Sequence, residues 1–180
     1  MAPKVARREP GKGARHPQST GVAPEREEEG HTVLKPLRGR LVLDASVLIE
    51  ILAGSKPAAA LVDSIVSGEA EVYATRLGLA EALYVTCRLW GWEKAVERIQ
   101  ALIDSGMVAI IEDEEIWSLA ASCKCRIPIS LGDCYTLAAA KRYRLRPLFL
   151  KPEKELLENT ERIRQWLDGN PEYLATAAPT

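Results

Sequence analysis

The chain has 180 residues, a length that suits one domain with a substantial core and is short for two. Its composition, 47% hydrophobic and 27% charged, is that of a globular protein, and no apolar run approaches the roughly 20 residues that span a bilayer. The net charge of −1 excludes binding of nucleic acid through bulk positive charge, so any such surface must be a local patch.

Residues 1–38 are rich in Pro, Gly, Arg and Glu and show no apolar periodicity. Such a segment cannot bury enough apolar surface to offset its ordering entropy, so we expect a flexible tail. The tail contains no apolar core of a secretory signal, and we therefore expect a cytoplasmic protein without membrane contact. Four cysteines without paired knuckles favour buried thiols over structural zinc.

From residue 40 onwards, short apolar β-branched runs alternate with segments of helical periodicity. Several of the helical segments end at a glycine, the usual stop signal of a helix. In chain order, this pattern predicts a strand at 40–45, helices at 45–54 and 57–68, a strand at 71–76, helices at 77–91 and 92–106, a strand at 107–112, helices at 112–126 and 130–144, a strand at 146–150 and a helix at 153–169.

Short buried strands that alternate with helices indicate a parallel sheet covered on both faces. The sequence therefore predicts a three-layer α/β/α sandwich with a mostly parallel central sheet. We expect this domain to cover residues 39–170 and to be followed by a C-terminal tail over residues 171–180.

One aspartate interrupts the first apolar strand, in LVLDASVLI, which spans residues 41–49. An isolated buried carboxylate costs several kcal/mol, so Asp44 needs a partner, a cation or access to water. Ligands of α/β sheets bind beyond the carboxyl ends of the strands, and Asp44 stands where the first strand ends. We therefore expect it to point into a cleft.

Three more acids are expected at the same edge of the sheet: Glu81, Asp133 and Glu153. A cluster of carboxylates repels itself unless a cation compensates its charge. Oxygen ligands without His or Cys select Mg²⁺ or Mn²⁺, which can bridge to a phosphate and activate water. Phosphodiester hydrolysis fits such a site.

Each of the four acids also has a structural explanation. Asp44 could cap the helix that follows it, and Asp133 matches a capping box with Ser130. Glu81 could pair with one of the arginines at 76 and 88. Glu153 could simply begin a solvated helix. No single acid is specific for a site, whereas the ordered set of four is.

The stretches LVLDASVLIEIL (41–52), ATRLGLAEALYV (74–85) and IPISLGDCYTLAAAKRYRLRPLFLKPEKEL (127–156) resemble the PIN-domain family, in particular the VapC-type toxins and their archaeal relatives. The resemblance covers roughly residues 40 to 160. It implies a PIN-like three-layer fold and Mg²⁺- or Mn²⁺-dependent ribonuclease activity. It further implies that the catalytic, metal-holding residues are Asp44, Glu81, Asp133 and Glu153, supported by Ser46.

The fourth acidic position departs from the family pattern. Many relatives have Thr or Ser, one residue and then Asp, whereas this chain has Lys151, Pro152 and Glu153. The Lys151 ammonium is expected to support the site by contacting the scissile phosphate, or to weaken a second metal site.

Basic residues between the third acid and the fourth strand could bind the RNA backbone: Lys141, Arg142 and Arg144. The alternative is a helix C-terminus that carries bases to suit its dipole.

We therefore expect a metal-dependent endoribonuclease, the toxin half of a toxin–antitoxin pair, with RNA as its substrate. Exposed apolar residues in 45–54 and 92–103 would provide the contact with an antitoxin or a homodimer. Two alternatives stay open. One is a PIN-like RNA- or protein-binding subunit that is weak or inactive in catalysis, and the other is a housekeeping RNA-processing nuclease without an antitoxin.

Overall fold

The computed structural model describes residues 37–175, so the expected tail over 1–38 lies outside it except for its last two residues. A five-stranded parallel sheet runs through the middle of this domain, in the order β3-β2-β1-β4-β5. The strands are β1 (Gly39–Leu43), β2 (Ala70–Thr75), β3 (Ala109–Ile111), β4 (Arg146–Phe149) and β5 (Glu172–Tyr173).

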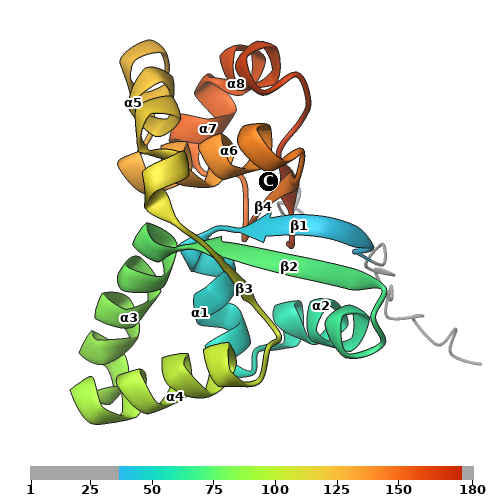
Figure 1. The fold of residues 1–180 in the computed structure, drawn as a ribbon, viewed down its shortest axis with the longest axis vertical. Helices are drawn as coiled ribbons and strands as arrows, with labels where there is room; N and C mark the ends of the chain where they lie inside the picture. Colours follow the sequence, from blue (N-terminus) through green and yellow to red (C-terminus); the bar gives the residue numbers. More distant parts are fainter. Residues whose placement is uncertain (1–36, 176–180) are drawn as a thin grey trace, which may run out of the picture. The chain divides into compact units, whose positions relative to one another are not determined.

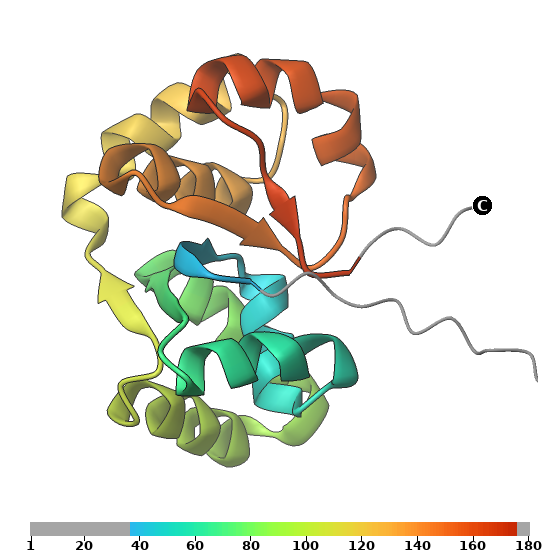
Figure 2. The same ribbon diagram turned by 90° about the vertical axis from the view of Figure 1, so that its right-hand side faces the viewer.

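Helices cover both faces of the sheet, as Figures 1 and 2 show. One layer contains α1 (Ala45–Ala53), α2 (Lys56–Val66), α3 (Arg76–Trp90) and α4 (Trp92–Asp104). The other contains α5 (Trp117–Arg126), α6 (Leu131–Tyr143), α7 (Lys154–Glu158) and α8 (Thr160–Leu167). The expected three-layer α/β/α sandwich with a parallel sheet is thus confirmed.

The first strand shows why an apolar run predicts this architecture. Leu41 and Leu43 pack into the core beneath α1–α4, while Val42 packs into the core beneath α5–α8. All three are fully buried, and each buried side chain of this size contributes about 1.5–3 kcal/mol to folding. A strand that is covered on both faces needs apolar residues at every position, not at alternate ones.

Two predicted helices are interrupted in the structure. The segment 112–126 begins as a short 3₁₀ turn, η1 (Asp113–Glu115), because the fully buried Ile116 adopts a φ of −125° before α5 starts. The segment 153–169 divides into α7 and α8 at Asn159, which is buried and whose amide donates to Glu155 O at 2.9 Å. At each break the buried residue has a φ outside the helical range, −125° at Ile116 and −111° at Asn159.

The fifth strand was not predicted from the sequence. Glu172 and Tyr173 pair with β4, and the next two amides donate to Phe149 O and Leu150 O, both at 2.8 Å. Two residues are too few to show a periodic pattern. The boundary expected at residue 170 is therefore too early, while residues 176–180 of the expected C-terminal tail lie outside the described part of the chain.

Within residues 37–175, no single helix is long and apolar enough to cross a membrane. Only α1 and α2 taken together, as a pair bent by 92°, meet the criteria of length and composition. Of the four thiols, those of Cys123 and Cys134 are buried as expected, that of Cys87 is half-buried and that of Cys125 is exposed.

Candidate functional site

Asp44 follows β1 directly, at the carboxyl edge of the sheet. Its backbone amide donates to Leu148 O at 2.9 Å, which fixes the position of Asp44 beside β4. Its carboxylate accepts from the Ser46 amide at 2.9 Å and thereby caps α1. The capping role considered from the sequence is confirmed, and the same residue also lines a cleft.

The Ser46 side chain links the ends of two neighbouring strands. Its hydroxyl donates to Asp44 Oδ2 at 2.5 Å and accepts from the Leu150 amide at 3.2 Å. Ser46 therefore holds the Asp44 carboxylate against the end of β4.

We expect Ser46→Ala to lower the free energy of unfolding by about 1–3 kcal/mol, because the part-buried Leu150 amide loses its acceptor. For a domain of this size, the melting temperature would fall by roughly 2–4 °C per kcal/mol. The matched control is Ser67→Ala, which removes an exposed hydroxyl at the end of α2. Thermal melts of the two variants test this role, and equal melting temperatures would contradict it.

Asp133 lies in the first turn of α6. Its amide donates to the Ser130 hydroxyl at 2.9 Å, and its carboxylate accepts from the Ser130 amide at 3.3 Å. The predicted capping box is therefore present. Because α6 leads into the amino end of β4, its own first turn lies at the carboxyl edge of the sheet, beside Asp44.

Glu81 lies one turn into α3, and its carboxyl group reaches across to Gly132 at the start of α6. The ion pairs considered from the sequence are absent among residues 37–175. Arg76 instead binds Glu112 through two hydrogen bonds of 2.5 and 2.7 Å, and Arg88 lies over the Tyr84 ring. The Glu81 carboxyl group, with neither of these arginines as a partner, lines the cleft.

Glu153 precedes α7 at its N-cap position but makes no capping hydrogen bond. Its side chain is exposed and lines the same cleft, as does that of Lys151. In the described part of the chain, Lys151 lies within 4 Å of no carboxylate oxygen. Lys151 thus lines the cleft without an ion pair to its acids, and its expected contact with a phosphate or effect on a second metal site stays a prediction.

The cleft has a volume of about 320 Å³ and opens at the carboxyl edge of the sheet. All four predicted acids line it. The sequence analysis missed its apolar walls and a further acid, although Glu155 stands only two residues after Glu153. The remaining lining residues are Ala45, Ser46, Ile49, Val85, Ser130, Phe149, Lys151, Glu155 and Leu156.

Two carboxyl groups of the cleft, those of Asp133 and Glu81, have a raised pKa. Burial raises the pKa of Asp133 to about 6, and repulsion from Asp44 and Glu153 adds to this effect although the hydrogen bonds with Ser130 oppose it. Burial likewise raises the pKa of Glu81, again with repulsion from Asp44 and Glu153. The cluster therefore carries negative charge that a bound cation would stabilise.

Asp44, Glu81, Asp133 and Glu153 have the chemistry of a Mg²⁺ or Mn²⁺ site, since all their donors are carboxylate oxygens. Across residues 37–175, no three such side chains converge closely enough to form a preformed cage. The donors would therefore have to draw together around an ion, and the flexible Glu81 and Glu153 side chains allow such a movement.

The three predicted RNA-binding residues lie far from this cleft, at the opposite end of α6. Lys141 is eight residues beyond Asp133, which corresponds to about 12 Å along the helix. It donates to Trp166 O, Arg142 pairs with Glu115 at 3.6 Å, and Arg144 ends the helix. The helix carries them to the amino edge of the sheet, so they do not line the cleft, and their binding of the RNA backbone stays a prediction.

Comparison with known proteins agrees with this geometry. The family model of the PIN domain matches residues 41–149. None of the curated proteins matches the chain at a significant level.

Among solved structures, the chain is similar to a toxin–antitoxin complex from Klebsiella pneumoniae, with 14% identity, 64% of this chain and 89% of that chain covered, and a TM-score of 0.49. It is also similar to FitAcB from Neisseria gonorrhoeae, with 18% identity and a TM-score of 0.49. That match covers 74% of this chain and 97% of the FitAcB chain.

Proposed function

This chain belongs to the PIN domain family, whose members are generally nucleases, and on that premise we propose that it is a Mg²⁺- or Mn²⁺-dependent endoribonuclease. The observation that carries the proposal is the convergence of Asp44, Glu81, Asp133 and Glu153 on one cleft. Burial, together with repulsion from neighbouring carboxylates, raises the pKa of Glu81 and Asp133, as expected of a site that is complete only with a cation.

Each acid would make a distinct contribution to the site. Asp44 is held by Ser46 and by the end of β4, so it supplies a fixed oxygen. Glu81 and Asp133 arrive from facing helices and close the cleft from the other side, while Glu153 stands at its exposed rim. When bound, a divalent cation supplies charge stabilisation for a phosphate and lowers the pKa of water.

A direct assay would incubate the purified protein with end-labelled single-stranded RNA, and with single-stranded DNA of the same sequence. We expect RNA fragments with Mn²⁺, none with EDTA, and little cleavage of DNA. Intact RNA in Mn²⁺ would contradict the proposal and favour a binding subunit, which a mobility-shift assay would then reveal. Equal cleavage of the two substrates would contradict the assignment of RNA.

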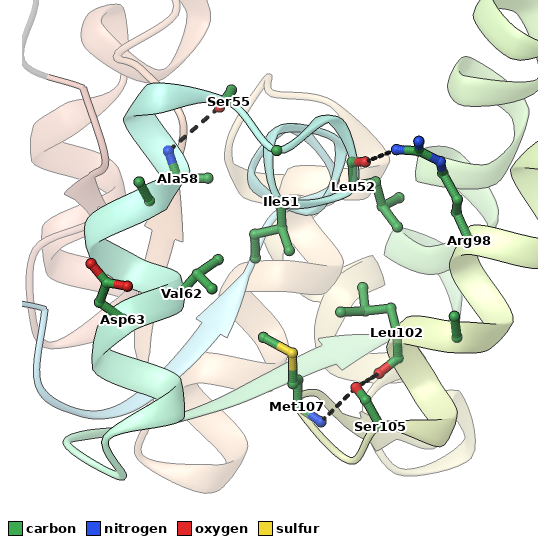
Figure 3. Close-up of a pocket in the computed structure, with 13 residues that line it drawn as sticks. Ile51, Leu52, Ser55, Ala58, Val62, Asp63, Arg98, Leu102, Ser105 and Met107 are labelled. Atoms are coloured by element: carbon green, nitrogen blue, oxygen red, sulfur yellow. Dashed lines mark hydrogen bonds between the residues drawn. The ribbon is translucent and has the colours of Figure 1, made fainter.

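A second part of the proposal concerns an antitoxin partner. An apolar groove of about 560 Å³ lies between α1, α2 and α4, away from the acidic cleft (Figure 3). Ile51, Val62, Leu102 and Met107 point into it, and Arg98 stands at its rim, donating to Leu52 O at 2.6 Å. An amphipathic helix with an acid opposite Arg98 fits such a groove.

We expect Ala59→Glu to weaken binding of the proposed antitoxin by about tenfold or more, because it places a charge in the apolar groove. Val66→Glu is the matched control: Val66 lies on the same helix, is 75% exposed and is outside the groove. Calorimetric titration of both variants measures the effect. Unchanged affinity in Ala59→Glu would remove the groove from the proposal, and absence of any binding partner would favour a housekeeping nuclease.

A homodimer would use a different surface. Helices α3 and α4 carry four exposed apolar side chains, those of Tyr84, Leu89, Trp92 and Val96. The large Trp92 side chain is 61% exposed. A patch of this kind is typical of a protein contact. Sedimentation of the purified protein tests for the dimer.

A further inference from the structure

Gly132 lies in the first turn of α6, directly before Asp133. A Cβ atom built on Gly132 would lie 2.5 Å from Glu81 Oε2 and 3.5 Å from Glu81 Cδ. The next nearest atom is Ser130 Oγ, at 3.7 Å. The Glu81 carboxyl group therefore occupies the space that any other side chain at position 132 would take.

Neither the backbone nor the helix requires a glycine here. Gly132 is not among the glycines of positive φ, which comprise Gly39, Gly54, Gly68, Gly91 and Gly106. Inside a helix, glycine is less favourable than alanine. None of the three nearest atoms belongs to the backbone of another element, so close packing of the α3 and α6 main chains does not explain it either. The Glu81 carboxyl group accounts for the missing side chain.

We propose that Gly132 is a positioning residue: its lack of a side chain lets the Glu81 carboxyl group cross from α3 and lie against the first turn of α6, in the cleft that Asp133 also lines. The inference rests on the proposed metal-dependent function, in which both carboxylates hold the cation. It adds a residue that bears no ligand atom of its own yet sets the position of the Glu81 carboxyl group in the cleft.

An alanine at position 132 should move the Glu81 carboxyl group and leave the fold in place. The obstructing atoms form the end of a flexible side chain, which can turn away from a new methyl group. Residues that orient metal ligands typically change metal affinity by about 10- to 100-fold when they are altered. We expect Mn²⁺ affinity to fall by about this factor in Gly132→Ala.

The test is calorimetric Mn²⁺ titration of the wild type, Gly132→Ala, Glu81→Asp and the double variant. Aspartate is one methylene shorter, so its carboxylate stands back from position 132. We expect the methyl group to cost much less affinity in the Glu81→Asp background than in the wild type. The matched control is Gly169→Ala, since Gly169 has open space around its Cβ position and a φ outside the left-handed region.

Thermal melts without metal complete the test. We expect Gly132→Ala to melt at or above the wild-type temperature, and a fall of many degrees would show a packing role and overturn the inference. Equal Mn²⁺ affinities of Gly132→Ala and the wild type would overturn this inference alone. A wild type that binds no Mn²⁺ would overturn the proposed function and this inference with it.

Discussion

Asp44→Asn is expected to abolish RNA cleavage and to leave the fold intact. The substitution removes one anionic oxygen from the cleft, so the proposed cation would lose a ligand that Ser46 holds in place through two hydrogen bonds. A bound cation stabilises several kcal/mol of charge in such reactions, and each 1.36 kcal/mol is a factor of ten in rate. The rate should therefore fall by about a hundredfold or more.

The fold survives because an asparagine can still cap α1. Its amide oxygen can accept from the Ser46 amide as the carboxylate does, and asparagine and aspartate are nearly equivalent as caps. Asp44→Ala is the informative companion, since it should lose cleavage and also about 0.5–2 kcal/mol of stability. Cleavage rates and melts of both variants check this. Full activity in Asp44→Asn would contradict the assigned role, and a large loss of stability would indicate that the residue serves the cap alone.

Asp133→Asn should make the metal-free protein more stable at neutral pH and no more stable near pH 4. The pKa of Asp133 is about 6 in the folded protein, compared with 3.8 as its ordinary value. Between these two values the folded protein holds a proton that the unfolded chain has released. Stability therefore falls as pH rises from about 4 to about 6, and the deficit then stays constant.

The asparagine of the variant carries no charge at any pH, so the stability of the variant does not fall between about pH 4 and about pH 6 for this reason. We expect it to gain about 1–2 kcal/mol at pH 7.5, with allowance for solvent screening of a partly exposed group. Urea unfolding in EDTA at pH 4 and pH 7.5 measures the difference. Asp104→Asn, which removes a charge from the exposed end of α4, serves as the control. A gain of the same size at both pH values would contradict the account of a self-repelling cluster.

At pH 7.5, adding Mn²⁺ should make the wild type more stable than Asp133→Asn, the reverse of the order expected without metal. A ligand that binds only the folded state raises stability in proportion to RT ln(1 + [L]/Kd), so the wild type should gain and Asp133→Asn should not.

The sheet and the four acids could be predicted from the sequence because each has a local signature. Leu41, Val42 and Leu43 form an apolar run that only a strand covered on both faces needs. The carboxyl ends of parallel strands meet at one edge, so acids that follow different strands are expected to gather there. Three acids of the cleft follow strands in this way, and Asp133 joins them because α6 runs back from this edge to the amino end of β4.

Other features depend on contacts between distant residues and had no local signature. Strand β5 consists of two residues and exists only through its pairing with β4. The bond between Ser46 Oγ and the Leu150 amide joins residues 104 positions apart. Helix α6 is long enough to take Lys141 to the far edge of the sheet, although Lys141 is near Asp133 in the sequence. Two residues that are close in sequence can therefore lie at opposite ends of one helix and belong to different sites.

Calorimetric Mn²⁺ titration of the wild type and Asp44→Asn at pH 7.5, repeated at pH 5, tests most directly whether the acidic cleft is a metal site. We expect the wild type to bind Mn²⁺ at pH 7.5 and to bind it more weakly at pH 5, because Asp133, whose pKa is about 6, is then largely protonated. Asp44→Asn should bind weakly at both pH values. Equal binding by the two proteins, or wild-type binding that does not change between pH 7.5 and pH 5, would contradict the account.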